Sequence, residues 1–442
     1  MNCHRLLLPW LSFLLFITLV GPSVLSAEQW GHWRGPTGNG VATNATPPTE
    51  WSDTKNVKWK VAIDGKGSGS PVIWGNRVFV VTAVSEQTPL SESDERSDSS
   101  SRRGRRSTPL TRTKFEVLCF DRSTGKKVWQ QTAAIATPHQ GVHSTNNFAS
   151  ASPCTDGEHV YAFFGSRGLY CYTMDGKLVW KRDDFGKMET RNAFGEGSSP
   201  TIAGDKIIVP WDHDGPSAVY ALDKLTGKTI WKTKRDEPTN WSTPLIVEHG
   251  KGKQVVLNGQ NYARSYDLES GKELWRCGGQ TQRPCASAVH HDGLVYVGSG
   301  FRGSFLGAFR ADSEGDIGDT QNVVWSVNRN TPDIASPLLS DGRIYFHKGK
   351  SGVISCLNAK TGEPYYDATR VPGLSSIYAS PVAAGGYVFL TGRSGRTVVL
   401  KDGEEFEVVA SNSVGETVDA TPAPVGDQLF IRGEKHLFCI EE

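Results

Sequence analysis

The sequence lacks the features that would place it in several common classes of protein. Its 48 lysines and arginines are balanced by 47 aspartates and glutamates, for a net charge of +1, so no general attraction to nucleic acid or to anionic membranes is expected. It contains no glycine-rich phosphate loop after a strand, no Gly-x-Ser-x-Gly and no Cys-x-x-Cys, and these absences remove three signatures of enzymes. Helical periodicity is missing too, which favours a β protein.

Long apolar runs are also scarce. The run Leu6 to Val20 follows Arg5 and precedes the small residues Ser26-Ala27. It is short for a membrane span and is typical of a signal peptide, without a lipobox cysteine. We expect residues 1–27 to be removed on export, which leaves an N-terminal extension at 28–56 and a monomeric periplasmic or secreted protein without a transmembrane span. An uncleaved N-terminal anchor is the alternative.

The cysteines do not suggest a disulfide framework. One of the eight lies in the expected signal peptide, and the remaining seven are an odd number for an exported protein. Cys277 and Cys285 share one loop and form the candidate disulfide, which their separation permits but does not require. The others mostly occupy one equivalent strand position of the repeat described next, where a small core side chain fits: Cys119, Cys171, Cys356 and Cys439.

The sequence is dominated by a repeat. A unit that opens with a small residue and proline recurs, after the first copy, at intervals of roughly 41 to 49 residues, and such periods are typical of radial or solenoidal arrays. The openings are Ser70-Pro71, Ser152-Pro153, Ser199-Pro200, Thr243-Pro244, Ser336-Pro337, Ser380-Pro381 and Thr421-Pro422, with Ser287-Ala288 as a copy that has lost its proline.

Many units close with Asp-x-x-x-Gly-Lys and a tryptophan. In this hairpin turn the aspartate is expected to accept hydrogen bonds from backbone amides and the glycine to take a positive φ. The tryptophan that follows lies on an outer strand, where it is expected to dock against the neighbouring unit rather than to bind a ligand. The residues at this place are Trp129, Trp180, Trp231, Trp275 and Trp325.

These units predict an all-β fold, an eight-bladed β-propeller of four-stranded antiparallel blades over residues 57–442. The last unit has only three strands, whereas Val57 to Ile63 is a strand without a unit of its own. Pairing the two would complete the last blade and close the ring; seven blades are the main alternative. Residues 85–114 are rich in Ser, Arg and acidic residues and are expected to form a disordered loop inserted in the first blade, with a docking tail as the alternative.

The repeat resembles that of the PQQ-like β-propellers, which include quinoprotein alcohol dehydrogenases and the BamB outer-membrane assembly lipoprotein. The likeness covers Trp51 to Glu442, and the opening WGHWRGPTGNG at residues 30–40 is similar to exported PQQ-like repeat proteins of planctomycete-type bacteria. The chain departs from the dehydrogenases because it has no adjacent cysteines and no calcium-binding set that can be aligned. No cofactor is therefore expected, with PQQ and calcium as the alternative.

Binding is expected at the loops of one face, around the mouth of the channel. Basic residues recur at equivalent loop positions, which favours an anionic ligand or an acidic peptide there; solvated turn residues are an equally good interpretation. The pair His139 and His143 is a weaker candidate for a metal site. The residues expected on the binding face are Arg167, Asp212, His213, Asp214, Trp241, Asn261, Arg283, Arg302, Lys348, Arg393 and Arg396.

The sequence thus favours an exported, non-catalytic scaffold of the cell envelope that binds a protein segment or an anionic glycan or peptide. A PQQ-dependent or related oxidoreductase is the alternative, and a polymer-active enzyme that uses the channel mouth is a third hypothesis.

Overall fold

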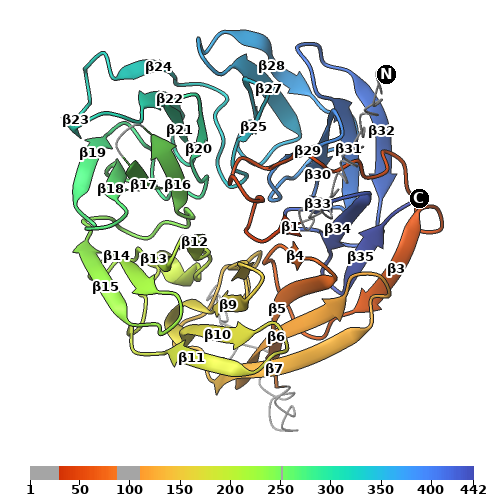
Figure 1. Cartoon of the computed structure of the whole chain (residues 1–442). Helices are drawn as coiled ribbons and strands as arrows, with labels where there is room; N and C mark the ends of the chain where they lie inside the picture. Colours follow the sequence, from red (N-terminus) through yellow and green to blue (C-terminus); the bar gives the residue numbers. More distant parts are fainter. Residues whose placement is uncertain (1–28, 87–109, 250–251) are drawn as a thin grey trace, which may run out of the picture.

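The computed structural model describes residues 29–86, 110–249 and 252–442. Eight small sheets stand radially around a central channel, as Figure 1 shows, so the predicted eight-bladed β-propeller is confirmed. Two short 3-10 helices, η2 (Gly165–Arg167) and η3 (Arg191–Ala193), lie in loops. No helix in the described part of the chain is long and apolar enough to cross a membrane. The expected signal peptide at 1–27 lies outside the described residues.

Each blade contains four antiparallel strands, numbered from the channel outwards except where noted. The first four blades are β4 (Val72–Trp74), β5 (Arg77–Ser85), β6 (Thr113–Asp121), β7 (Lys127–Ala136); β8 (Cys154–Thr155), β9 (His159–Phe163), β10 (Leu169–Thr173), β11 (Leu178–Arg182); β12 (Thr201–Ala203), β13 (Lys206–Trp211), β14 (Ala218–Asp223), β15 (Thr229–Lys234); and β16 (Leu245–His249), β17 (Gly252–Leu257), β18 (Ala263–Asp267), β19 (Glu273–Cys277). The next three are β20 (Val289–His291), β21 (Leu294–Ser299), β22 (Phe305–Arg310), β24 (Val323–Val327); β25 (Leu338–Ser340), β26 (Arg343–His347), β27 (Val353–Asn358), β28 (Pro364–Arg370); and β29 (Val382–Ala384), β30 (Tyr387–Thr391), β31 (Arg396–Lys401), β32 (Val408–Ser413).

The eighth blade joins the two ends of the chain. It consists of β33 (Ala423–Val425), β34 (Gln428–Arg432), β35 (His436–Ile440) and, on its outer edge, β3 (Val57–Ala62). In the antiparallel pair of β3 with β35, Trp59 lies opposite Cys439, and Figure 1 shows the red strand beside the blue one. The predicted closure of the ring is therefore confirmed, and it leaves no open edge between the first and last blades.

Two details differ from the sequence-based expectation. The expected loop at residues 85–114 is slightly too long at both ends, because β5 continues to Ser85 and β6 begins at Thr113. Residues 87–109 lie outside the described part. In addition, β23 (Gly315–Asp316) adds a short parallel strand to the edge of the fourth blade at β19.

The small residue that opens each unit links neighbouring blades around the channel. Its hydroxyl accepts a hydrogen bond from the backbone N–H of the equivalent residue one blade earlier, and this satisfies a buried donor at the start of each inner strand. The links that form this chain are Ser70 to Ser152, Ser152 to Ser199, Ser199 to Thr243, Thr243 to Ser287, Ser287 to Ser336, Ser336 to Ser380 and Ser380 to Thr421. The copy without proline keeps its place because it keeps its serine.

The Asp-x-x-x-Gly-Lys turn and the tryptophan are two sides of one contact. Asp223 accepts hydrogen bonds from the backbone N–H and the hydroxyl of Thr226, at 2.8 and 2.7 Å. This turn brings Gly227, at φ 70°, under the ring of Trp180 from the preceding blade, whose Nε1 donates to the carbonyl of Lys224 at 3.0 Å. Trp59, Trp129, Trp231 and Trp325 make the same pair of contacts with the next blade.

A comparison of two glycines measures how much stability is lost when a side chain is placed against the tryptophan. Gly227 and Gly204 both have positive φ, at 70° and 64°, but a methyl group at Gly227 would lie 2.7 Å from Trp180, whereas nothing lies within 4 Å at Gly204. We expect Gly227→Ala to lower the free energy of unfolding by about 1–3 kcal/mol more than Gly204→Ala does, because of overpacking against the indole. Urea unfolding of the two variants measures the difference, and equal losses would contradict the contact.

The core lies between neighbouring sheets. The fully buried side chains of Tyr161 in the second blade and Ile207 in the third, for example, belong to one apolar cluster. Cys119 pairs with Trp129 across the two outer strands of its blade, and the other cysteines at this place have equivalent partners, so the position needs a small side chain behind a large one.

The N-terminal extension crosses one end of the channel. Its strand β1 (Gln29–Trp30) pairs with β4, and β2 (Val41–Ala42) pairs in parallel with β29. Between them the chain reaches across the centre of the ring, as the red segment in Figure 1 shows. Further hydrogen bonds tie the segment to the second, fifth, sixth, seventh and eighth blades, at Thr155, His290, Leu339, Ala383 and Gly426. We call residues 29–46 the N-terminal strap.

Candidate functional site

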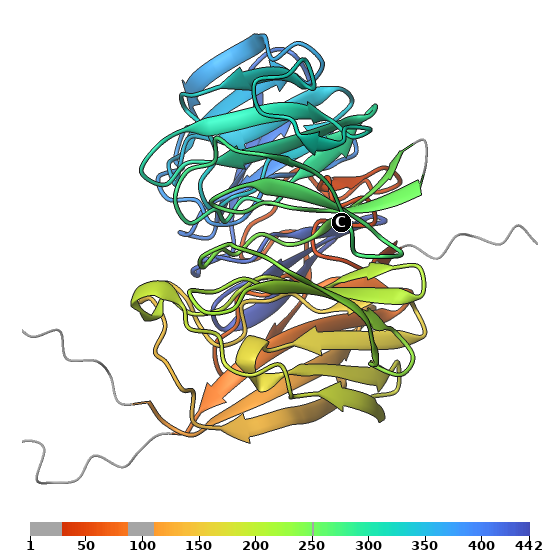
Figure 2. The ribbon, with the colours of Figure 1, turned by 90° about the vertical axis from the view of Figure 1, so that its left-hand side faces the viewer.

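A cavity of about 250 Å³ opens at the mouth of the channel. Trp33 of the N-terminal strap contributes to it. The remaining lining comes from the Ser/Thr ring, from loops that connect successive blades and, at Phe301 and Lys350, from loops within the fifth and sixth blades. In Figure 2 the strap lies to the right, whereas η3, next to Phe194 of the lining, lies to the left. We call this the mouth cavity, and its aromatic and charged lining residues are Trp33, His143, Phe194, Trp241, Arg283, Phe301, Asp333, Lys350, Tyr378 and Asp419.

One side of the mouth cavity is cationic. The guanidinium of Arg283 lies 4.8 Å from the ring centroid of Phe194 and 5.3 Å from that of Phe301. Arg302 lies over Phe301 as well, at 5.4 Å. Burial lowers the pKa of Arg283, and the neighbouring charges of Arg191 and Arg302 lower it further. With its faces covered by rings, the guanidinium keeps its N–H edges for a carboxylate or a phosphate.

The backbone at both arginines is unusual. Arg283 and Arg302 adopt left-handed conformations, with φ of 54° and 53°, which few residues other than glycine occupy. Within the described residues, neither side chain forms an ion pair with a carboxylate. Backbone strain of this kind gathers at ligand-binding loops. The pair therefore presents, at a strained part of the loops, positive charge that no ion pair within the described residues neutralises.

Other parts of the mouth cavity are closer to neutral. Arg393 bonds to Asp419 through Nε at 2.6 Å and Nη2 at 3.1 Å, and it lies 4.5 Å from the ring centroid of Tyr378. Asp333 is 7% exposed, and burial raises its pKa while Lys350 acts in the other direction. Of the basic residues expected on this face, Arg393 is thus neutralised within the protein.

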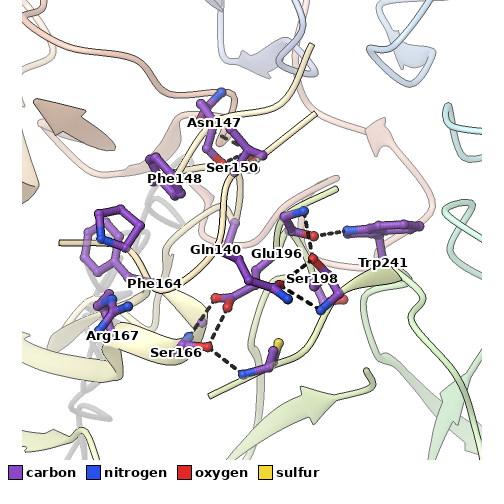
Figure 3. Close-up of a pocket in the computed structure, with 18 of the residues that line it drawn as sticks. Gln140, Asn147, Phe148, Ser150, Phe164, Ser166, Arg167, Glu196, Ser198 and Trp241 are labelled. Carbon is purple, nitrogen blue, oxygen red and sulfur yellow. Dashed lines mark hydrogen bonds between the residues drawn. The ribbon is translucent and has the colours of Figure 1, made fainter. Parts of the chain in front are cut away.

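Beside the mouth cavity, a smaller pocket of about 40 Å³ lies at the second blade, between the loops that connect this blade to the first and third blades (Figure 3). Glu196 accepts hydrogen bonds there from the backbone N–H and the hydroxyl of Ser166. Burial raises the pKa of Glu196, although the bonds from Ser166 oppose the shift. Trp241 shows its indole to both cavities and donates to the carbonyl of Gly195 at 2.8 Å.

His139 belongs to this pocket rather than to a metal site. Its Nε2 lies 2.8 Å from the carbonyl of Met188, and its Nδ1 lies 3.0 Å from Nη2 of Arg167. His143 lines the mouth cavity instead, with Nδ1 bonded to Thr145 at 2.8 Å. Because both ring nitrogens of His139 are engaged within the protein, the structure does not bring the two histidines together as ligands.

The predicted group Asp212, His213 and Asp214 separates into three environments. Asp212 is buried against Arg235 at 2.8 Å, with both side chains at most 1% exposed. His213 accepts a hydrogen bond from the backbone N–H of Glu189 at 3.1 Å, and burial lowers its pKa. Asp214 accepts hydrogen bonds from the backbone N–H and the hydroxyl of Thr239 on the next loop. Asp212 and His213 are structural, and only Asp212 touches the smaller pocket.

Other predicted residues lie away from the mouth cavity. Asn261 donates to the carbonyl of Asp236, Arg396 bonds to Ser411 on the neighbouring strand at 3.0 Å, and Lys348 is outside the lining. The predicted disulfide is absent: Cys277 and Cys285 are free thiols, because Cys277 points into an apolar cluster while Cys285 faces the channel.

Sequence reasoning missed three aromatic residues of the mouth cavity. Trp33, Phe194 and Phe301 are apolar side chains in loops, and nothing in their local sequence separates them from ordinary packing residues. Lys350 is one of many polar loop residues, and its local sequence does not distinguish it from solvated ones. Only the path of the loops brings these side chains around Arg283.

The mouth cavity has residues that suit PQQ, but among the described residues it lacks a set that suits the calcium ion bound with PQQ in quinoprotein enzymes. Arg283 and Lys350 suit the carboxylates of PQQ, and Trp33 and Trp241 offer aromatic surface for its rings. Calcium takes six to eight oxygen ligands, and carboxylates are prominent among them, yet in the described chain no cluster of three His, Cys, Asp or Glu side chains lies in the mouth cavity. The residues present therefore do not fit the pair.

Comparison with known proteins gives one family and several distant relatives. A sequence profile described as outer membrane protein assembly factor BamB matches residues 113–365 and 259–441. The quinohemoprotein alcohol dehydrogenase ADH-IIG of Pseudomonas putida is 28% identical over 117 residues, which are 23% of this chain and 15% of that protein. The match thus spans far less than two thirds of the dehydrogenase.

Solved structures repeat the same two names. BamB from Moraxella catarrhalis superposes with a TM-score of 0.50 at 14% identity, over 74% of this chain and 88% of the other. Quinohemoprotein alcohol dehydrogenase from Comamonas testosteroni superposes with a TM-score of 0.60 at 11% identity, over 93% and 80%. At these identities the likeness concerns the fold alone.

Proposed function

The chain belongs to the BamB-like family of PQQ-type β-propellers, and from this membership we propose that it is an exported, non-catalytic binding platform of the cell envelope. Its ligand is an acidic segment of a partner protein that carries aromatic side chains. The description of the family as an assembly factor supports a protein partner. The observation that carries the proposal is Arg283, which lies near the rings of Phe194 and Phe301 and forms no ion pair with a carboxylate of the described residues.

The chemistry of the mouth cavity supports this class of ligand. Carboxylates would bond to the free edge of the Arg283 guanidinium and lie near Arg302 and Lys350. Aromatic side chains would pack on Trp33 and Trp241, which line the same cavity. Arginine, tryptophan and tyrosine are the residue types that most often dominate binding energy at protein interfaces. The lining therefore has the composition of a recognition site.

A peptide titration tests the proposal. The probe is a fluorescein-labelled peptide of alternating aspartate and phenylalanine, compared with the same peptide carrying asparagine for aspartate. We expect the acidic peptide to bind more tightly, and Arg283→Gln to weaken it by about tenfold to a hundredfold, as expected for a central interface arginine. Arg396→Gln, at a basic residue outside the mouth cavity, is the matched control and should bind like the wild type.

Three outcomes would contradict the proposal. Equal affinity of the wild type and Arg283→Gln for the acidic peptide, measured by fluorescence anisotropy, would remove the mouth cavity as the site. Saturable binding of PQQ with Ca²⁺, followed by reduction of a dye with an alcohol or sugar, would instead identify an oxidoreductase. Preference for an anionic glycan over the peptide would change the class of partner.

A further inference from the structure

A second basic side chain lacks a partner, far deeper in the protein than Arg283. Arg432 ends β34 in the last blade and is 1% exposed. Its Nε, Nη1 and Nη2 atoms have no hydrogen-bond partner in the described structure. Burial lowers the pKa of Arg432 to about 10. Most buried polar groups are hydrogen-bonded, so three orphaned donors on one guanidinium call for an explanation.

The repeat shows that a charge is not needed at this position. Phe430 pairs with Cys439 in the last blade as Phe79 pairs with Cys119 in the first. Two residues further along the strand, Arg432 therefore corresponds to Val81, which is buried and apolar. An aliphatic side chain fills the equivalent place in the first blade, so packing alone does not account for arginine in the last.

Glu416 does not neutralise Arg432 through an ion pair in the described structure. Glu416 raises the pKa of Arg432 through its charge, but the two side chains form no ion pair. The carboxylate of Glu416 instead bonds to Nδ1 of His436 at 2.7 Å and to the backbone N–H groups of Lys435 and His436, at 3.0 and 2.9 Å. A buried charge without a close partner costs several kcal/mol.

Arg432 lines a cavity of about 140 Å³ at the junction of the last and first blades. We call it the seam cavity. Its charged lining residues are Lys66, Arg393, Asp419, Arg432 and Glu434, three cations against two carboxylates, for a net charge of +1. Arg393 and Asp419 already neutralise each other at 2.6 Å. The hydroxyls of Ser68 and Thr145 also border this space.

We propose that the seam cavity binds one small oxyanion, a free carboxylate or phosphate, which bonds to the guanidinium of Arg432 with Lys66 nearby. The anion supplies the acceptors that Arg432 lacks, and its charge balances the excess positive charge of the cavity. The site does not include Arg283, although Ser68, Thr145 and Asp419 line both the seam cavity and the mouth cavity. Because it joins the first and last blades, occupancy stabilises the closed ring.

Thermal unfolding with formate, acetate and phosphate, each replacing chloride at constant ionic strength, tests the site. We expect at least one anion to raise the Tm of the wild type, by about 3 °C at a concentration a hundredfold above its Kd. Arg432→Leu should lose this shift, and without the anion its Tm should equal or exceed that of the wild type, since an unpaired buried charge has gone. Arg310→Leu, at an exposed arginine outside the cavity, should keep the shift.

Direct measurements on the wild type cover the case in which Arg432→Leu does not fold. Calorimetry should detect saturable binding of the same anion with one site per chain, and selenate soaked into crystals should give an anomalous peak at hydrogen-bond distance from Arg432. An unchanged Tm together with no calorimetric binding overturns the proposal. An equal shift in the wild type and Arg432→Leu also overturns it, because the stabilisation would then arise elsewhere.

Discussion

Replacing Arg235 by methionine is expected to lower the free energy of unfolding by about 3–5 kcal/mol. Arg235 lies in the third blade with a side chain that is 0% exposed. It donates to both oxygens of Asp212 at 2.8 and 3.0 Å, to the hydroxyl of Tyr266 at 2.7 Å and to the carbonyl of Asn258 at 3.2 Å. Its loss leaves the buried carboxylate of Asp212 without its positive partner, although the hydrogen bond from Asn240 at 2.6 Å remains, and two further acceptors lose this donor. Urea unfolding measures the change.

The double variant Arg235→Met with Asp212→Leu separates the charge from the packing. It should recover much of the loss, because no buried charge remains unpaired. Lys181→Met is the surface control: its ion pair with Asp183 at 2.7 Å joins side chains that are 53% and 50% exposed, and such pairs contribute about 1 kcal/mol or less. A double variant as unstable as Arg235→Met would refute the argument from unpaired charge.

Trp30→Ala is expected to cost about 3–5 kcal/mol, the range for removing a large buried aromatic side chain. Trp30 is 1% exposed although it lies in the N-terminal strap, and it belongs to the same apolar cluster as Ile73 and Val425 of the first and last blades. The strap is therefore part of the core rather than an appendage. Chemical unfolding of the variant checks the loss.

Trp33→Ala, three residues further on, is the matched comparison. Trp33 lines the mouth cavity and is only partly buried, so its removal should lower affinity for the acidic peptide more than it lowers stability. If the two tryptophan variants lost the same free energy of unfolding, the strap would not divide into a buried anchor and a residue of the mouth cavity.

Much of the fold could be predicted because the repeated motifs mark particular strands of each blade. The Ser/Thr-Pro openings mark the inner strands, and the turn aspartate, glycine and tryptophan mark the outer ones, so counting them yields the blades. The unpaired strand at Val57 to Ile63 predicted the closure of the ring. The strap could not be placed in this way, because β1 and β2 are two residues each and their partners are set by tertiary contacts.

The candidate site was less predictable, for a physical reason. Loop position placed Trp241 and Arg283 correctly near the channel mouth, but it could not tell Arg283 from Arg393, which differ in whether a carboxylate such as Asp419 lies within reach. Asp212 looked like a surface ligand because its burying partner, Arg235, is 23 residues away in sequence. Which charged side chains form ion pairs across loops depends on how the loops fold in three dimensions, and local composition does not reveal it.

The strap has a consequence for what can enter the ring. Because residues 29–46 cross the channel at the end opposite the mouth, a chain cannot thread through the propeller as a strand passes through a pore. An occupant must arrive and leave by the same opening, so it has to present a free end or a tight loop. A strand or helix of a partner can therefore reach the depth of the cavity only with its end first, whatever its charge.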